Sequence, residues 1–533
     1  MSNQLYFGDN LGVLRESIKD ESVDLIYLDP PFNSNATYNV LFRTPKGHQS
    51  DAQIEAFDDS WHWGERAEAA CADLMQQSNT DVAEVIRALR SILGDNDMMA
   101  YLAMMAIRLL ELHRVLKPTG SLYLHCDSTA SHYLKVVMDQ VFGAEHFRNE
   151  IVWVRSNPKS LGSSNFPNCT DALLRYTKTD AFVYHQPYAE HDEEYVTKAY
   201  RYSDAQGQYR LLPLLNPNDN RPNLTYEFLG VKRVWRWTRA RMQEGYDKGL
   251  VVQLKPGAVP QYKKYLEDSK GKTVTNCWTD IRQAAGNENL GYPTQKPLAL
   301  LERVITASSN EGDVVLDPFC GCGTAVHAAE KLKRQWIGID VTHLAISLVE
   351  KRLRDAFPGI LFEVHGTPTD IDGARNLAFR DKYQFQWWAC SLVNAQPFQG
   401  KKKGADTGID GVIYFQDDDQ LPKKIVVSVK GGDNVGVSML RDFAHVIDRE
   451  KAAIGLFVTL TEPTKNMVTE GIGTGYYTSP LTGAKFPKLQ VLTIEGLLSG
   501  KEQARYPRMD AGGLTFKKAK KEEKLAEQKS LDF

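Results

Sequence analysis

The chain has 533 residues, a hydrophobic content of 42% and a charged content of 25%, which is ordinary for a globular protein. Its formal net charge of −3 excludes an overall basic field, although a basic patch confined to one cleft is compatible with it. No apolar stretch approaches the roughly 20 residues that cross a bilayer, the N-terminus lacks the pattern of a secretory signal, and the 7 cysteines are odd in number and widely spread. We therefore expect a cytoplasmic protein without a membrane partner, built from roughly two to four structural units.

The first strong pattern is an apolar run over residues 23–28 that ends in Asp29-Pro30-Pro31-Phe32. A short apolar run bounded by turn residues is typical of a buried strand, and functional loops lie at the carboxyl ends of parallel strands. The polar stretch over about 45–97 is interpreted as an insertion. Residues from about 187 to 280 are rich in Tyr, Arg, Asn, Pro and Lys without a clear period, which predicts a separate polar lobe. Between these two regions we expect a helix over 99–116, a strand over 121–126 and a helix over 129–142.

A second strand of the same kind, residues 314–316, runs into the loop Asp317-Pro318-Phe319-Cys320-Gly321-Cys322-Gly323-Thr324. Gly321 and Gly323 allow the backbone to approach a ligand closely, and Asp340, at the end of the next strand, is placed to accept hydrogen bonds from ribose hydroxyls. Cys320 and Cys322 are one residue apart and have no second cysteine pair, which argues against a zinc site. The elements expected after the loop are a helix over 325–333, a strand over 335–340 and a helix over 342–356. This alternation predicts the α/β class with a doubly wound sheet.

Asp29-Pro30-Pro31-Phe32 is suited to a difficult reaction, methyl transfer to an aromatic amine. The lone pair of such an amine is delocalised into the ring, so the nitrogen is a poor nucleophile. Two acceptors, the Asp29 carboxylate and the Pro30 carbonyl, would favour a pyramidal nitrogen whose lone pair points at the methyl group. The two prolines would keep these acceptors aimed. Phe32 offers a flat face on which an extruded base can stack.

With both loops in place, the chain over roughly residues 3–365 resembles the beta class of amino-methyltransferases, in which the catalytic motif precedes the cofactor motif. Type III modification subunits and many solitary adenine methyltransferases belong to that class. The resemblance implies an S-adenosylmethionine-dependent, site-specific methyltransferase with a Rossmann-like sheet that acts on duplex DNA by base flipping. Its implied catalytic residues are Asp29, Pro30, Pro31 and Phe32. Its implied cofactor-binding residues are Asp9, Asn10, Thr294, Gln295, Lys296, Pro297, Asp317, Pro318, Phe319, Gly321, Gly323, Thr324 and Asp340.

The resemblance also bears on the target atom. Asp29 resembles the residue found in N6-adenine enzymes, whereas Ser is more usual in N4-cytosine enzymes, so we expect adenine and leave cytosine as the alternative. The chain contains no Pro-Cys dipeptide, which C5-cytosine methylation requires. The family often has His before its equivalent of Asp171, and this chain has Thr170, which argues against a catalytic role for that segment.

The family places its target-recognition region where this chain has the polar lobe. Arg, Asn and Gln side chains in such a region can read bases, and Lys can hold phosphates. The most basic aromatic segment of the lobe is 232–239. A solvated amphipathic segment is the alternative for each of its residues. The candidates for DNA recognition are Lys232, Arg233, Arg236 and Arg239.

A second α/β domain is expected after about residue 373, and over about 380–470 it resembles Mrr-type restriction endonuclease domains. In such domains carboxylates hold Mg²⁺, and a Lys orients water or offsets phosphate charge. Asp410, the implied metal ligand, and Lys430 match the pattern. Ser428 departs from it because Glu or Gln is usual there, and Gln386 occupies a place where relatives have an acid. Two alternatives stay open: Mg²⁺-dependent cleavage by a bifunctional enzyme, or a domain that only binds DNA or a partner.

The C-terminal residues, Gln528-Lys529-Ser530-Leu531-Asp532-Phe533, resemble the Gln-x-x-Leu-x-Phe peptide by which bacterial proteins dock on the replication sliding clamp. Gln528, Leu531 and Phe533 carry the match, at the end of a Lys- and Glu-rich tail that is expected to be disordered. Besides duplex DNA, the resemblances imply a restriction subunit, the clamp or a second copy of the chain as partners. The expected divisions are a catalytic half over 1–186, a target-recognition region over 187–285, a cofactor half over 286–372, an endonuclease-like domain over 373–505 and a charged tail over 506–533.

Two other classes of function compete with this interpretation. One is a non-catalytic DNA-binding protein that kept the fold, against which Asp29, the cofactor loop and Asp340 argue. The other is a methyltransferase that acts on RNA or on protein glutamine. The glutamine enzymes use an Asn-Pro-Pro-Tyr loop, whereas this chain has Asp29, and the large polar lobe favours duplex DNA.

Overall fold

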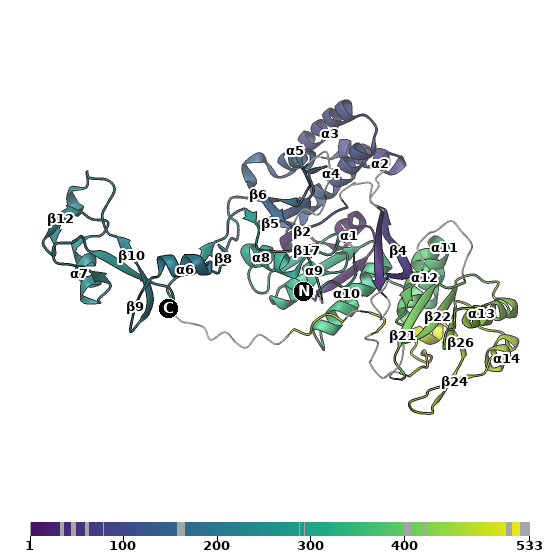
Figure 1. Cartoon of the computed structure of the whole chain (residues 1–533). Coiled ribbons are helices and arrows are strands. Elements are labelled where there is room, and N and C mark those ends of the chain that lie inside the picture. Colours follow the sequence, from purple (N-terminus) through teal and green to yellow (C-terminus); the bar gives the residue numbers. More distant parts are fainter. Residues whose placement is uncertain are drawn as a thin grey trace. The chain divides into compact units, whose positions relative to one another are not determined.

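The computed structural model describes residues 2–31, 37–43, 49–58, 63–77, 79–156, 166–286, 288–292, 294–398, 408–418, 422–507, 514–516 and 518–522. The chain forms two compact units, one of which comprises Met1–His185 with Asn276–Phe533 and the other Gln186–Thr275 (Figure 1). Within the described ranges, no helix has both the length and the apolar character needed to cross a membrane.

The larger unit contains a nine-stranded sheet with the order β16-β6-β7-β5-β2-β17-β18-β1-β19. Strands β6, β5, β2 and β17 of this sheet are labelled in Figure 1. Neighbouring strands are parallel except at β7, which is antiparallel to both β5 and β6. The expected doubly wound α/β class is confirmed. The strands are β1 (Gln4–Phe7), β2 (Val23–Leu28), β5 (Leu116–Cys126), β6 (Phe147–Val154), β7 (Thr170–Thr177), β16 (Cys277–Trp278), β17 (Val314–Asp317), β18 (Gln335–Asp340) and β19 (Glu363–His365).

The strand order creates a switch point between β2 and β17. After β2 the chain continues to β5 on one side, and after β17 it continues to β18 on the other. Ligands of doubly wound sheets bind at the carboxyl ends of the strands at such a point. The helices of this part are α1 (Asn10–Ser17), α4 (Asp97–Val115), α5 (Ser131–Phe142), α8 (Leu298–Ser308), α9 (Thr324–Lys331) and α10 (His343–Ala356). The two loops that the sequence predicts to carry the catalytic and cofactor motifs therefore leave the sheet side by side.

The stretch over 45–97, which we interpreted as an insertion, contributes to the core of the sheet domain. It contains β4 (Gln49–Asp58), which pairs with the preceding strand β3 (Thr37–Arg43), and two helices, α2 (Glu65–Gln76) and α3 (Thr80–Leu93). Leu74 of α2 and Ile86 of α3 are fully buried in the cluster that also contains the apolar side of α4. Because the apolar residues of α2 and α3 recur at helical spacing between many charged ones, average polarity concealed two amphipathic helices.

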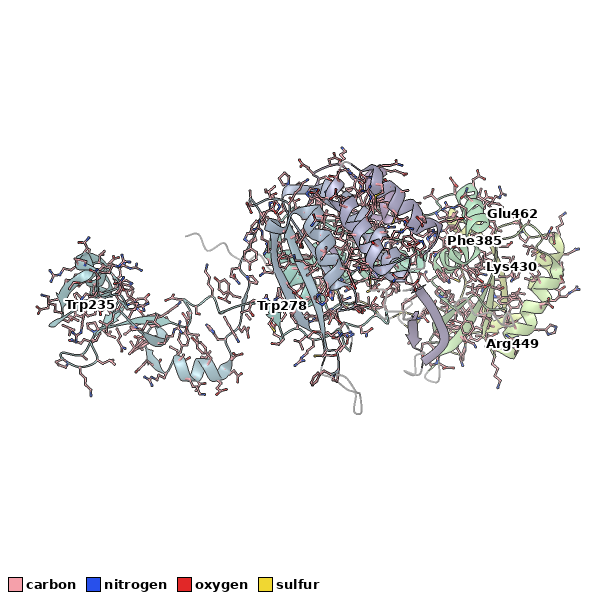
Figure 2. The ribbon with its side chains drawn as sticks, turned by 90° about the horizontal axis from the view of Figure 1, so that it is seen from above. Trp235, Trp278, Phe385, Lys430, Arg449 and Glu462 are labelled. Atoms are coloured by element: carbon pink, nitrogen blue, oxygen red, sulfur yellow. The ribbon has the colours of Figure 1, made fainter. Side chains whose placement is uncertain are left out.

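The smaller unit is a set of short antiparallel strands around its own apolar cluster of Leu214, Phe228, Trp235, Met242 and Val251. Trp235, which is labelled in Figure 2, is fully buried. Its indole N–H donates to the Tyr226 carbonyl at 2.8 Å. The elements are β8 (Tyr188–Ala189), α6 (Glu193–Ala199), β9 (Tyr202–Asp204), β10 (Gly207–Pro213), β11 (Thr225–Phe228), β12 (Val231–Val234), α7 (Arg239–Asp247), β13 (Val251–Val252), β14 (Gln261–Tyr265) and β15 (Lys272–Thr273). The lobe thus has a core that does not depend on the nine-stranded sheet.

The C-terminal part of the larger unit contains a five-stranded sheet with the order β20-β21-β22-β23-β26. One apolar cluster includes residues of α11 and α12, and another includes residues of α13 and α14, so helices cover both faces. The elements are α11 (Ile371–Arg380), α12 (Lys382–Leu392), β20 (Gln396–Pro397), β21 (Gly411–Phe415), β22 (Lys423–Lys430), α13 (Val437–Arg449), β23 (Ile454–Thr459), α14 (Lys465–Gly473), β24 (Tyr476–Thr478), β25 (Lys485–Pro487), β26 (Leu489–Thr493) and α15 (Ile494–Leu498).

Part of the expected tail is packed rather than free. The Thr515 hydroxyl bonds both the N–H and the carbonyl of Tyr414 at 3.0 Å. Phe516 packs against a small apolar cluster that contains Tyr292 and Trp387. Glu522 contacts His327 at 3.1 Å. The sliding-clamp peptide at 528–533 lies outside the described residues.

Candidate active site

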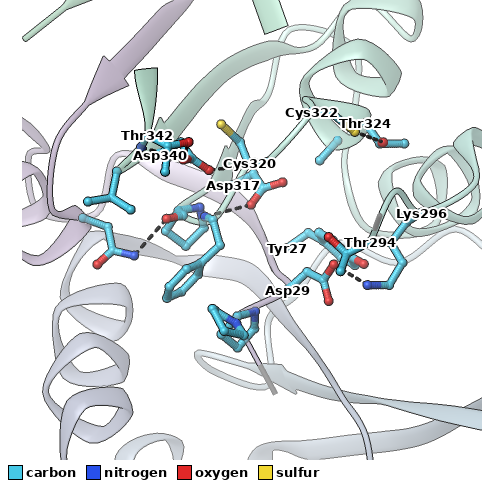
Figure 3. Close-up of a pocket in the computed structure, with 18 of the residues that line it drawn as sticks. Tyr27, Asp29, Thr294, Lys296, Asp317, Cys320, Cys322, Thr324, Asp340 and Thr342 are labelled. Atoms are coloured by element: carbon cyan, nitrogen blue, oxygen red, sulfur yellow. Dashed lines mark hydrogen bonds and ion pairs between the residues drawn. The ribbon is translucent and has the colours of Figure 1, made fainter. Parts of the chain in front are cut away.

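A pocket of about 400 Å³ lies at the switch point, where the carboxyl ends of β2, β17 and β18 meet (Figure 3). Asp29 follows β2, Asp317 ends β17 and Asp340 ends β18, so each central strand delivers one carboxylate. The register of β2 and β17 pairs Leu25 with Val315 and Ile26 with Leu316, which brings the two loops level with one another. The volume is in the range of small-ligand sites.

Asp29 is held by a residue that is distant in the sequence. Its Oδ2 forms an ion pair with Lys296 Nζ, and the two side chains are 16% and 11% exposed (Figure 3). The other oxygen, Oδ1, is buried and has no hydrogen-bond partner among the described residues. A buried carboxylate oxygen without a donor is unfavourable unless a ligand supplies one. Asp29 therefore offers an acceptor position to whatever enters the pocket.

The loop after β17 is a tight turn over the pocket. Phe319 N–H donates to Asp317 Oδ1 at 3.1 Å, and burial raises the pKa of Asp317 well above its usual value. Gly321 has a φ of +49°, and a Cβ there would stand 3.3 Å from the Tyr292 ring. Gly323 has a φ of +76°, and its Cβ would stand 2.8 Å from Val349. Close approach and a left-handed backbone both favour glycine at 323, whereas at 321 the left-handed backbone is the main reason and the contact with Tyr292 is tight.

The Asp340 side chain connects the loop over Asp317–Thr324 with the turn at Thr342 that begins α10. Its Oδ2 accepts from Gly321 N–H at 3.0 Å, and its Oδ1 accepts from the Thr342 N–H and hydroxyl at 2.9 Å. A carboxylate has about four acceptor positions, so one on Oδ2 stays available to a ligand. Burial raises the pKa of Asp340 to about 6, although these hydrogen bonds act in the opposite direction.

A buried arginine organises the N-terminal side of the pocket. Arg108 Nε donates to Asn10 Oδ1 at 2.6 Å, and Arg108 Nη2 donates to Asp9 Oδ1 at 2.9 Å. Asn10 Nδ2 in turn donates to the Pro318 carbonyl at 2.9 Å. Arg108 is 4% exposed, whereas the Asp9 side chain is 60% exposed. This chain of bonds links the N-terminus of α1, where Asp9 is the N-cap, to α4 and to the loop after β17.

The structure brings most of the predicted site residues together. Phe32 lies outside the described residues. Pro297 and Gly323 do not line the pocket; they are the N-cap residues of α8 and α9. Gln295 lines the pocket, but its amide holds the preceding loop: Nε2 donates to the Glu288 carbonyl at 2.7 Å and Oε1 accepts from Leu290 N–H at 2.8 Å. The predicted residues that line the pocket are Asp9, Asn10, Asp29, Pro30, Pro31, Thr294, Gln295, Lys296, Asp317, Pro318, Phe319, Gly321, Thr324 and Asp340.

Sequence reasoning missed several lining residues, among them Tyr27, Arg66, Arg108 and Thr342. Arg108 had a usable signal, because it is a charge inside an otherwise apolar helical pattern. Thr342 had another, because it follows Asp340 as the N-cap of a helix. Arg66 lies on α2 and Tyr27 lies within β2, and neither carries a pattern that marks it as a pocket residue.

Among the described residues, two of the predicted endonuclease residues, Asp410 and Ser428, lie together, and Lys430 is on the same strand as Ser428. Asp410 Oδ1 accepts from Gln386 Nε2 at 3.0 Å, and Asp410 Oδ2 accepts from Val429 N–H at 2.6 Å. Ser428 Oγ lies 3.5 Å from Asp410 Oδ2, and Lys430 ends the same strand, β22 (Figure 2). Among the residues that the structure describes, no group of three or more His, Cys, Asp or Glu side chains could hold a metal ion.

The four candidates in the lobe separate into two kinds. Arg236 Nε donates to the Leu215 carbonyl and Arg239 Nη2 to the Glu227 carbonyl, both at 2.9 Å, so these guanidiniums hold the lobe's own backbone. Lys232 and Arg233 are exposed on β12. The second pair is therefore the better placed for an external partner.

Comparison with known proteins agrees with this geometry. Residues 23–351 match the family model of a DNA methylase, and residues 380–471 match that of a restriction endonuclease. The chain is 30% identical to the type II methyltransferase M.EcaI of Enterobacter cloacae over 66% of its own length and 69% of the relative. It is 29% identical to the StyLTI Mod subunit, a type III restriction-modification enzyme of Salmonella typhimurium, over 62% of its length and 50% of the subunit.

Among solved structures, a complex of M1.HpyAVI with S-adenosylmethionine matches 66% of this chain and 98% of its own, at 17% identity and a TM-score of 0.32. The DNA methylase match covers more than half of the chain and contains both pocket loops, while the restriction endonuclease match contains Asp410 and Lys430. The chain belongs to the N6/N4 DNA methylase family and carries a second, Mrr-type restriction endonuclease domain.

Proposed function

We propose that this S-adenosylmethionine-dependent DNA methyltransferase modifies the N6 amino group of adenine in a specific duplex site, on a base flipped into the pocket. The observation that supports it best is Asp29 Oδ1, a buried acceptor with no partner among the described residues, next to the cofactor loop. An amino group supplies the hydrogen-bond donor that this oxygen lacks. Cytosine N4 presents the same group and is the alternative.

The residues of the pocket fit S-adenosylmethionine. The side chains of Asp29 and Asp340, and the buried carboxyl group of Asp317, lie around a site whose ligand carries a positive sulfonium. The available position on Asp340 Oδ2 suits a ribose hydroxyl, and Gly321 leaves room where any side chain would meet Tyr292. When bound, the cofactor supplies an electrophilic methyl group.

The chain's own residues would prepare the nucleophile. Asp29 Oδ1 accepts one N–H of the target amine and the Pro30 carbonyl accepts the other, which favours a pyramidal nitrogen. Lys296 holds the opposite oxygen of Asp29, so the carboxylate keeps its orientation. This is preorganisation, because the acceptors are in place before the base arrives.

For the second domain we propose DNA or partner binding without cleavage. The residues present do not fit a Mg²⁺ centre of the usual kind, because both oxygens of Asp410 already accept hydrogen bonds from Gln386 and Val429. Gln386 and Ser428 are neutral where a hard cation prefers carboxylates. Lys430 is retained at the end of β22 and suits a phosphate.

The first prediction concerns Asp29. Asp29→Ala removes the acceptor, and we expect the rate of methyl transfer to fall by about 10²- to 10³-fold, the effect of losing one preorganised group, so that modification of the motif in host DNA is lost. Long-read methylome sequencing measures it. Asp372→Asn, at a side chain that is 86% exposed, is the control and should keep full modification. Detection of N4-methylcytosine at the motif would overturn the adenine assignment and leave methyl transfer intact.

The second prediction is a pH dependence of cofactor affinity. Because the pKa of Asp340 is about 6, the carboxylate that accepts from ribose is present above pH 6 and lost below it. Titration calorimetry should show S-adenosylmethionine affinity falling as pH drops from 7 to 5, and Asp340→Asn should bind weakly with a flat profile. A slope that survives in Asp340→Asn would assign the dependence to another group, such as Asp317.

The third prediction concerns the lobe. The double substitution Lys232→Ala, Arg233→Ala should weaken binding to duplex DNA and reduce the slope of log K against log salt by about 0.9 for each phosphate that the lobe no longer neutralises. Fluorescence anisotropy at several salt concentrations measures both quantities. Lys248→Ala, which removes a charge from an ion pair with Glu244 in the same lobe, is the control. Equal slopes for all three proteins would contradict the assignment.

The fourth prediction concerns cleavage. With Mg²⁺ and unmodified DNA, the wild-type chain should cut no faster than Asp410→Ala, with or without S-adenosylmethionine. A plasmid-nicking assay measures this. Cutting by the wild type that disappears in Asp410→Ala would show an active nuclease and refute the binding-only role.

A further inference from the structure

A chain of three buried polar side chains crosses the sheet beside the catalytic pocket. The Tyr27 hydroxyl on β2 lies 2.8 Å from His125 Nδ1 on β5, and His125 Nε2 lies 3.3 Å from Asp171 Oδ2 on β7. The three residues are 2%, 0% and 5% exposed. Asp171 Oδ1 faces Arg155 Nε at 3.3 Å. Three neighbouring strands therefore contribute one member each to a connected network.

The environment determines which way these hydrogen bonds run. Burial, and then the positive charge of Lys296, lower the pKa of His125, so the imidazole is neutral near pH 7. Burial acts to raise the pKa of Asp171, but the bond from His125 and the charges of Arg155 and Lys296 outweigh it and leave that pKa lowered. A carboxylate can only accept. His125 Nε2 must therefore carry the proton, and Nδ1 must accept.

The consequence falls on Tyr27. Burial raises the pKa of Tyr27 well above its usual value, so the hydroxyl stays protonated, and it must donate its proton to His125 Nδ1. Its oxygen can then offer only lone pairs to any other group. Tyr27 lines the pocket two positions before Asp29, and residues so spaced along a strand project to the same side (Figure 3).

We propose that His125 and Asp171 are positioning residues for methyl transfer, which fix the Tyr27 oxygen as a hydrogen-bond acceptor in the pocket beside Asp29. The pocket wall formed by β2 then presents acceptors to an incoming amino group. With the proton of Tyr27 pointed the other way, the hydroxyl would place a donor against the same N–H groups. The network thus gives Asp171 a role, although Thr170 replaces the His that the family often has before it.

The inference rests on methyl transfer to an amino group, and it is the same for adenine and cytosine. Four full-length variants test it. Tyr27→Phe removes the oxygen, and His125→Leu removes both hydrogen bonds of the central residue. His125→Gln keeps the direction of both hydrogen bonds, because an amide oxygen can accept from Tyr27 while the amide nitrogen donates to Asp171. Tyr123→Phe is the matched control, since Tyr123 is 2% exposed and its hydroxyl bonds Ser308 at 2.8 Å outside the network.

We expect single-turnover and steady-state assays to show kcat reduced about tenfold or more in Tyr27→Phe and His125→Leu, the effect of one lost interaction in the transition state. His125→Gln should recover most of that loss. Tyr123→Phe should keep the wild-type kcat. The KM for S-adenosylmethionine and its affinity by calorimetry should stay within twofold of wild type in all four variants, because the network does not contact Asp340.

A spectroscopic measurement tests the direction of the two hydrogen bonds at His125 without turnover. In the full chain labelled with ¹⁵N-histidine, the His125 signal, assigned by its loss in His125→Gln, should show a protonated Nε2 and an unprotonated Nδ1 at pH 7. A protonated Nδ1, a His125→Gln variant as slow as His125→Leu, or a Tyr123→Phe loss equal to that of Tyr27→Phe would each overturn the proposal. The tautomer is measured without DNA or cofactor. A result that contradicts the proposed network therefore says nothing about the adenine assignment, and the two can fail separately.

Discussion

The parallel pairing of β2 with β17 is the constraint on which the active site depends. These strands are nearly 290 residues apart in the chain, and their register sets the loop after Asp29 level with the loop after Asp317. Each loop alone is incomplete, since one carries the Asp29 carboxylate and the other is a glycine-containing turn, and both line the same pocket. Only a sheet whose strand order reverses at this position makes one pocket from both.

Within that pocket, each of two basic side chains pairs with a different acid, Lys296 with Asp29 and Arg108 with Asp9. Lys296 occupies one oxygen of Asp29 and leaves the other buried and available, while Arg108 holds Asp9 and Asn10 on the far wall. Buried charges are costly unless they are paired and hydrogen-bonded. The partners that neutralise the Asp29 and Asp9 carboxylates also fix their directions, so the same contacts stabilise the charges and shape the pocket.

The two matched domains differ in how completely their sites are equipped. The methylase pocket has all the acids that its motifs imply, whereas the described residues of the endonuclease-like site include one acid, Asp410, with Gln386 and Ser428 as neutral neighbours. The family match reports the fold of that domain, and the polar atoms around Asp410 report its chemistry. Fold and activity have separable requirements, because a domain can keep its apolar core after its ligands have changed.

The sequence by itself determined the α/β class, the two loops and their order, the second domain, and most of the residues that line the pocket. These are local features, because apolar periodicity and glycine or proline at strand ends are properties of short segments. Tertiary structure alone decided which residues meet. Nothing in the sequence pattern pairs Lys296 with Asp29 or Arg108 with Asn10. The sequence also gives no sign that His125 joins Tyr27 to Asp171. Those contacts depend on strand order and on burial, and both arise only when segments distant in the chain pack into one core.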